Sequence, residues 1–131
     1  MFLGLLLLAF NSNAQVLNNQ LNSKRIMLPN GWSLSPAGRS IELGDLPLNI
    51  AVSGSEKLMA VTNNGQSTQT IQLIDSKTEK VLDQVEIPKS FYGLKFSKDD
   101  RFLYASGGND NWILKYEVAN SKLRIRDTLK L

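Results

Sequence analysis

The loop Ser106-Gly107-Gly108-Asn109-Asp110-Asn111 carries the residue types best suited to chemistry in this sequence. Its glycines could cradle a phosphate, but a phosphate loop opens a helix, and the strand-forming residues Trp112-Ile113-Leu114 follow instead. Its Asn and Asp oxygens suit Ca²⁺, yet a calcium site needs about six to eight oxygens and no distal Glu completes an EF-hand-like spacing. The third interpretation is a turn between strands, because Asn, Asp and Gly tolerate left-handed dihedrals and bond locally. The turn requires the fewest assumptions.

The composition excludes several kinds of catalytic site. The 131 residues contain no Cys and no His. Thiol nucleophiles, thiolate or imidazole zinc sites, Ser-His-Asp triads and imidazole acid–base catalysis are therefore excluded for this sequence. The net charge is only +3, with basic residues scattered between acidic ones, which argues against nucleic-acid binding. Length and apolar content fit one ordinary globular domain.

The N-terminal run Met1–Phe10 is apolar, of a length typical of a signal peptide, and too short to span a bilayer. Ser12-Asn13-Ala14 places small residues where signal peptidase reads, so we expect residues 1–14 to be removed and Gln15 to come first. No Lys or Arg precedes the run, although signal peptides begin with positive charge. Two alternatives therefore stay open: the true start of the protein lies further upstream, or the run is a buried element of the fold. The sequence thus predicts an exported protein, periplasmic or extracellular, without a transmembrane segment and with a linking segment over residues 15–38.

From Leu48 onward the sequence repeats, and Ser53 falls on Ser97 at an offset of 44 residues. Each unit contains four short runs of β-branched and aromatic residues separated by polar turns. The central runs, such as Leu58–Val61, are almost wholly apolar, whereas Val81–Ile87 alternates as expected of a half-exposed outer strand. The later runs match at a slightly shorter spacing: Thr70–Asp75 with Trp112–Glu117, and Lys80–Val85 with Lys122–Asp127.

A repeat of this length is typical of β-propeller blades, each a four-stranded antiparallel sheet. We therefore expect an all-β chain with one blade over residues 48–87 and a second over 88–131. Propellers close into rings of about four to eight blades, so two blades would leave the ring open. We expect the chain to be the N-terminal part of a longer protein. Residues 39–47 would then hold an outer strand of the last blade, Arg39–Leu43, and the connection into the first blade.

Four segments of the first unit resemble the YVTN (YncE-like) propeller repeat: Ile50–Ser53, Ala60–Gly65, Ile71–Asp75 and Lys77–Val81. The second unit departs from that pattern, with Tyr104-Ala105-Ser106-Gly107 at the signature and Glu117 in place of the terminal Asp. Both units also lack the Asp-Gly of the first hairpin. Gly54-Ser55-Glu56 and Lys98-Asp99-Asp100 stand there, which predicts another type of turn.

The stretches Leu28–Arg39 and Leu43–Asn49 resemble the segment leading into the propeller of secreted bacterial proteins that fuse a YncE-like propeller to an alkaline-phosphatase-type phosphoesterase. The resemblance implies a non-catalytic binding or scaffold segment without a cofactor of its own. The partner would be a downstream domain of the same polypeptide holding a divalent metal, and the ligand is unknown. The alternative is an enzymatic propeller, such as a lactonase-type hydrolase, with a cation in its central channel.

In an antiparallel meander, the loops between second and third strands emerge at the same end as the connections into the first strands. That end is the predicted ligand surface, although turn-forming residues alone explain most of its composition. We expect Asp75 to accept hydrogen bonds from backbone N–H groups of its turn. We expect the charged side chains of the second unit to face outward: Lys115, Lys122, Arg124 and Arg126. The aromatic residues expected to pack between blades are Phe91, Tyr92, Phe96, Phe102 and Tyr104. The candidates are Asn63, Asn64, Gln66, Asn109, Asp110, Asn111 and Trp112 from the loops, with Asp45, Phe91 and Tyr92 from the connections.

Overall fold

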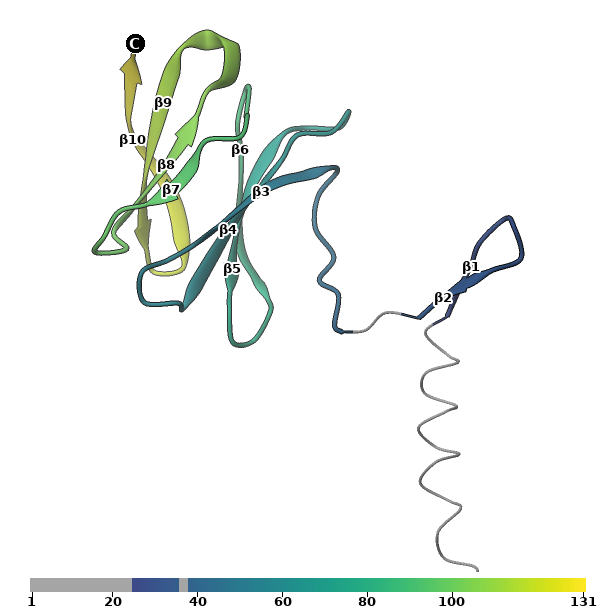
Figure 1. Ribbon diagram of the computed structural model, residues 1–131. Coiled ribbons are helices and arrows are strands. Elements are labelled where there is room, and N and C mark those ends of the chain that lie inside the picture. The colour runs from purple at the N-terminus through teal and green to yellow at the C-terminus, as the bar shows by residue number, and fades with distance from the viewer. Residues whose placement is uncertain (1–24, 36–37) are drawn as a thin grey trace, which may run out of the picture. The chain divides into compact units, whose positions relative to one another are not determined.

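The computed structural model describes residues 25–35 and 38–131 (Figure 1). The chain divides into two compact units, one up to Ser40 and one from Ile41 to Leu131. The described residues contain no α-helix, only the 3-10 turn η1 (Gly108–Asp110), and thus no helix able to cross a membrane. The predicted signal peptide, residues 1–14, and the start of the predicted linking segment lie outside the described residues.

The first unit contains a small antiparallel hairpin of β1 (Ile26–Met27) and β2 (Ser33–Leu34). Its turn is closed by a hydrogen bond from the Leu28 N–H to the Trp32 carbonyl, 2.8 Å long. Gly31 adopts a φ of 81°, a left-handed conformation that glycine accepts without steric cost. The side chains of both strands are exposed.

The second unit consists of two four-stranded antiparallel sheets, each with its strands in chain order (Figure 1). All eight strands agree with those expected from the repeat, apart from small shifts at their ends and longer third and fourth strands in the second sheet. Each neighbouring pair is joined by a short turn. The first sheet is β3 (Pro47–Val52), β4 (Leu58–Asn63), β5 (Thr70–Asp75) and β6 (Val81–Glu86); the second is β7 (Leu94–Phe96), β8 (Phe102–Ser106), β9 (Trp112–Ala119) and β10 (Lys122–Lys130).

The sequence repeat is reproduced in the first turn of each sheet. The Ser53 hydroxyl accepts the Leu58 N–H at 3.1 Å, and the equivalent Ser97 hydroxyl accepts the Phe102 N–H at 3.0 Å. Glu56 and Asp100 both adopt left-handed backbones, with φ of 60° and 58°. The expectation of a turn other than an Asp-Gly hairpin is therefore confirmed.

The turns between third and fourth strands differ between the two sheets. In the first, Asp75 Oδ1 accepts the N–H groups of Lys77 and Thr78 at 3.1 and 2.6 Å, as predicted. In the second, Asn120 and Ser121 form a two-residue turn with φ of 51° and 60°. Two left-handed central residues are typical of the type I′ turn, whose twist suits a tight hairpin.

The hydrophobic core lies between the two sheets. It includes Ile71 and Leu73 from β5, Leu103 from β8 and Leu114 from β9, all at most 4 % exposed. The central strand β5 is buried on both faces except at its last residue, while β6 is partly exposed along its length. This contrast between central and outer strands confirms the pattern expected from the sequence.

The predicted packing of aromatic residues between blades is confirmed for Phe96. Phe96 lies in the core. Phe102 and Tyr104 are half-buried on the opposite face of their sheet, because they alternate with the core residue Leu103 along β8. Phe91 and Tyr92 are exposed. These four residues therefore do not lie between the two described sheets, and their packing against a further blade stays a prediction.

Two aspartates connect the sheets through backbone N–H groups. Asp83 of β6 accepts the Leu123 N–H and pairs with Lys122 Nζ, both at 2.8 Å. Asp100, in the first turn of the second sheet, accepts the N–H groups of Gly54 and Ser55 at 2.6 and 2.9 Å. These contacts orient the sheets at separate points along their shared face.

The basic residues of the second sheet also have local roles. Besides the Lys122 contact, Arg126 pairs with Glu117 on the neighbouring strand, and Lys115 Nζ lies 4.2 Å from the centre of the Phe102 ring. The first interaction is a cross-strand ion pair and the second a cation–π contact. The exposed charges are thus part of the strand surface, as expected.

Residues 39–43, expected to supply an outer strand, form none here. The segment after them crosses one face of the first sheet, where the Gly44 N–H donates to Gln72 Oε1 at 3.1 Å. A Cβ added at Gly44 would lie 2.7 Å from Asn63 Cγ, so this close approach requires glycine.

Candidate functional site

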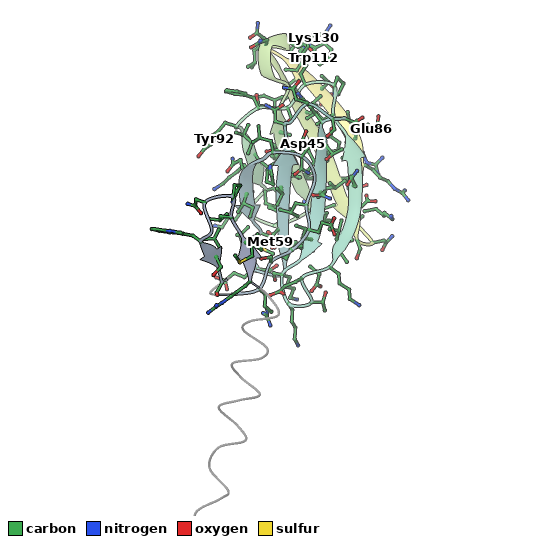
Figure 2. The ribbon with its side chains drawn as sticks, turned by 90° about the vertical axis from the view of Figure 1, so that its right-hand side faces the viewer. Asp45, Met59, Glu86, Tyr92, Trp112 and Lys130 are labelled. Carbon is green, nitrogen blue, oxygen red and sulfur yellow. The ribbon has the colours of Figure 1, made fainter. Side chains whose placement is uncertain are left out.

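One end of both sheets gathers the predicted loops and connections. We call it the loop end; it comprises residues 44–46, 64–69, 87–93 and 107–111. Asn64 and Gly65 donate their N–H groups to the carbonyls of Leu46 and Asp45, at 3.1 and 3.0 Å. Figure 2 shows Asp45 and Tyr92 toward this end and Met59 nearer the other. The predicted grouping of loops and connections is therefore present.

Asp45 holds the first loop in place. Its Oδ2 accepts the Ser67 N–H at 3.1 Å. A Cβ added at Gly65 would lie 2.1 Å from the Asp45 carboxylate, so the loop backbone lies directly against this group. These contacts account for an Asp at position 45 without a ligand.

Asn63 lies inside the protein instead of on the predicted ligand surface. It is 1 % exposed, and its Nδ2 donates to Thr70 Oγ1 and Gln72 Oε1, each at 3.0 Å. Gln72 Nε2 continues this polar row to Gln84 at 2.9 Å. Asn63 is the last residue of β4 and projects onto the sheet face under Gly44, which removes it from the candidate ligand residues.

The second loop, on which the sequence raised three alternatives, is a turn. Gly108 and Asn111 take left-handed φ values of 59° and 55°, and Asp110 pairs with Lys89 Nζ at 2.7 Å. The 3-10 turn is only three residues long, and the described residues contain no group of three or more His, Cys, Asp or Glu positioned for a metal. Backbone geometry accounts for Gly108 and Asn111, and the Lys89 pair for Asp110.

The remaining candidates differ in exposure. Gln66, Asn109 and Asn111 are exposed, whereas Asn64 and Asp110 are half-buried. Phe91 and Tyr92 stand out, because both are large aromatic side chains, 59 % and 63 % exposed. Together with Leu46, which is 60 % exposed, they are the large apolar side chains that the loop end offers to a ligand.

The backbone around this aromatic pair is fixed from several directions. The Ser90 N–H donates to Gln69 Oε1 at 2.7 Å, Asn49 Nδ2 donates to the Tyr92 carbonyl, and the Gly93 carbonyl accepts the Ser106 N–H at 2.8 Å. Exposed aromatic side chains on a fixed backbone lose little conformational entropy on binding.

Trp112 does not join the exposed candidates. It is half-buried against the core, and Lys130 Nζ lies 5.7 Å from its ring centre. Together with residues from both sheets it lines a cleft of about 380 Å³ at their outer edges, the rim cleft. Its lining residues are Val85, Glu86, Pro88, Trp112, Leu114, Tyr116, Leu123, Ile125 and Thr128. Sequence reasoning missed this cleft because its walls come from strands far apart in the chain.

Four Asp side chains have lowered pKa values, and each makes hydrogen bonds within the fold. The Ser97 hydroxyl and the Arg101 guanidinium lower the pKa of Asp99 to about 2. Bonds from Thr78 lower the pKa of Asp75, and those from Ser55 and Gly54 lower that of Asp100. At Asp83, burial opposes ionisation, but Lys122 and the Leu123 N–H outweigh it and lower the pKa. Each of these carboxylates is thus held by contacts within the fold.

These shifts predict loss of stability in acid. Carboxylates whose folded pKa lies below the unfolded value of about 3.9 stabilise the fold above that pH and cease to do so as pH falls through the folded pKa. The denaturation midpoint should therefore drop as pH falls from about 4 toward the Asp99 pKa of about 2. Urea denaturation followed by circular dichroism measures this, and a midpoint unchanged over that interval would contradict the assignment.

No protein-family model and no curated protein sequence matches the chain. Its fold is similar to a crystal structure of a protein from Lactobacillus plantarum, with a TM-score of 0.60 and 13 % sequence identity. The match covers 78 % of this chain and 30 % of that one, so the chain spans less than a third of its neighbour's length. Similarity at this identity shows the fold alone. With the two antiparallel four-stranded sheets, it fits a β-propeller-like, all-β architecture.

Proposed function

We propose that this chain is a non-catalytic binding segment of an exported β-propeller protein and that it presents its loop end to a ligand or partner. The observation that carries the proposal is the exposed pair Phe91 and Tyr92 on a backbone fixed by hydrogen bonds. Aromatic side chains held in this way are frequent centres of binding energy.

The proposal extends to the family and to the rest of the protein. The segments Ala60–Gly65 and Ile71–Asp75 support membership in the YVTN (YncE-like) repeat family. The stretch Leu28–Arg39 supports fusion to an alkaline-phosphatase-type phosphoesterase, whose divalent metal would lie outside this segment. In that arrangement the loop end positions a substrate or partner for the downstream domain.

The test is the kinetics of the full-length product. Replacing both Phe91 and Tyr92 by Ser should raise KM for a phosphoester substrate about tenfold or more and leave kcat unchanged, because binding is lost but the metal centre is intact. Trp32→Ala, which removes an exposed aromatic side chain of the first unit, is the matched control and should change neither.

Three results would contradict the proposal. A stop codon directly after Leu131 would remove the downstream domain. An unchanged KM in the double variant would exclude the aromatic pair as a binding site. Chelator-sensitive lactone hydrolysis by the full-length product, without phosphatase activity, would favour the enzymatic propeller instead.

Export rests on the sequence of residues 1–14 and needs its own test. Fusing residues 1–30 to a reporter that is active only outside the cytoplasm should give an active, processed product whose N-terminal sequencing begins at Gln15. Replacing Ala14 by a bulky residue should block that processing. An inactive, unprocessed fusion would show that the run Met1–Phe10 is not an export signal as encoded here.

A further inference from the structure

The rim cleft is a second surface with the properties of a binding site. Its volume of about 380 Å³ lies in the range of ligand pockets, which span roughly 300–1,000 Å³ and are mostly apolar. Both walls belong to the compact unit Ile41–Leu131, one from β6 and the other from β9 and β10. The cleft thus exists within this segment alone.

The cleft is mostly apolar and aromatic, with Glu86 and Thr128 as the polar residues of its lining. Leu114, Tyr116 and Leu123 form its buried wall, at most 5 % exposed. Burial raises the pKa of the Tyr116 phenol, so this group stays neutral. Ile125, which pairs with Tyr116, is 58 % exposed at the mouth. A large apolar side chain entering here would meet apolar atoms from both sheets.

Glu86 lies in the β6 wall of the cleft, and Lys130, which is not among the lining residues, stands beside Trp112 at one end. Lys130 Nζ lies over the Trp112 ring at 5.7 Å, and Figure 2 shows the two residues next to each other. Lys130 is on the cleft side of β10, because it pairs with Trp112 in the strand register. A ligand carboxylate beside the apolar group would complement this ammonium.

The strands bordering the cleft favour an extended peptide over a small molecule. Within residues 25–35 and 38–131, β6 pairs only with β5 and β10 only with β9, so each has one edge with no described strand beside it. Edges of this kind accept an added strand through main-chain hydrogen bonds, while pockets select its side chains. At the far end, the contact of Asp83 with Leu123 joins the sheets and limits the cleft.

We infer that the rim cleft binds an extended peptide segment that inserts a large apolar side chain between the sheets and places an adjacent carboxylate at Lys130. This site is separate from the loop end. It requires neither the aromatic pair Phe91 and Tyr92 nor a downstream domain.

Intrinsic fluorescence provides a direct readout, because the chain has only two Trp residues, Trp32 and Trp112. In a Trp32→Phe background, Trp112 alone reports on the cleft. The probes are synthetic peptides of about ten residues in which one Leu or Phe is flanked by Asp, compared with peptides flanked by Lys or lacking the apolar residue. We expect a saturable shift of Trp112 emission with the Asp-flanked peptides and at least about fivefold weaker binding of the others.

Two variants of β10 localise the binding. Ile125→Ser removes an exposed wall of the cleft and should weaken binding about fivefold or more. Leu129→Ser is the matched control, since Leu129 is 47 % exposed on the opposite face of the same strand and should leave binding unchanged. Lys130→Gln should abolish the preference for Asp over Lys flanks. Circular dichroism confirms that each variant is folded.

Each alternative outcome overturns the inference. Peptide binding that Ile125→Ser and Leu129→Ser weaken equally would place the site elsewhere. Emission shifts with a naphthalenesulfonate dye, but with no peptide, would make the cleft a small-molecule pocket. Absence of a shift with every probe would show that the cleft is not a binding site.

Discussion

Replacing Leu73 by Ala is expected to lower the free energy of unfolding of this chain by about 2–5 kcal/mol, the range for deleting a buried Leu side chain. Leu73 is 0 % exposed. It lies at the centre of β5, opposite Ala60, in the core between the two sheets. The substitution removes apolar contacts and leaves a cavity that a rigid sheet pair cannot close fully.

Urea denaturation of the chain, followed by circular dichroism, measures the effect. Ile71→Val, at the neighbouring core position, should cost only about 0.5–1.5 kcal/mol and reports the same core if Leu73→Ala does not fold. Leu129→Ala, on an exposed position of β10, is the control and should change stability by about 0.5 kcal/mol or less. Equal effects at Leu73 and Leu129 would show that the two sheets do not share this core in solution.

The strands and their order were predictable from the sequence, because a repeat of short β-branched runs has few other solutions. The offset that aligns Ser53 with Ser97 fixed the first turn of both sheets, and both hydroxyls accept the equivalent N–H group. The turn at Asp75 followed from local chemistry alone, since its carboxylate bonds residues two and three positions ahead.

The sequence could predict which loops share an end of the sheets, because that depends only on the alternating direction of the strands. Alternation of turns placed the loops and connections at one end, but it could not show that Asn63 projects onto a covered sheet face. Nor could it show that Trp112 turns into the rim cleft, because the cleft depends on the separation of two sheets. The contacts by which Asp83 and Asp100 join the sheets could not be predicted either, because their partners are 39 to 46 residues away in the sequence.

Asp83 is the polar residue whose loss should weaken the sheet pair most. Its side chain is 12 % exposed, and it bonds both the Leu123 N–H and the Lys122 ammonium at 2.8 Å. Asp83→Ala leaves that N–H group without its partner in a largely buried position. We expect the free energy of unfolding to fall by about 1–3 kcal/mol, the usual range when a buried donor loses its hydrogen-bond partner.

The comparison with Lys122→Ala separates the two bonds. Lys122 is 54 % exposed, and its loss leaves Asp83 still bonded to Leu123, so the cost should be only about 0.2–1 kcal/mol. The double variant should then be no less stable than Asp83→Ala alone, because Lys122 acts through Asp83. If Lys122→Ala were as destabilising as Asp83→Ala, the ion pair rather than the backbone bond would join the sheets, and stability would fall with added salt.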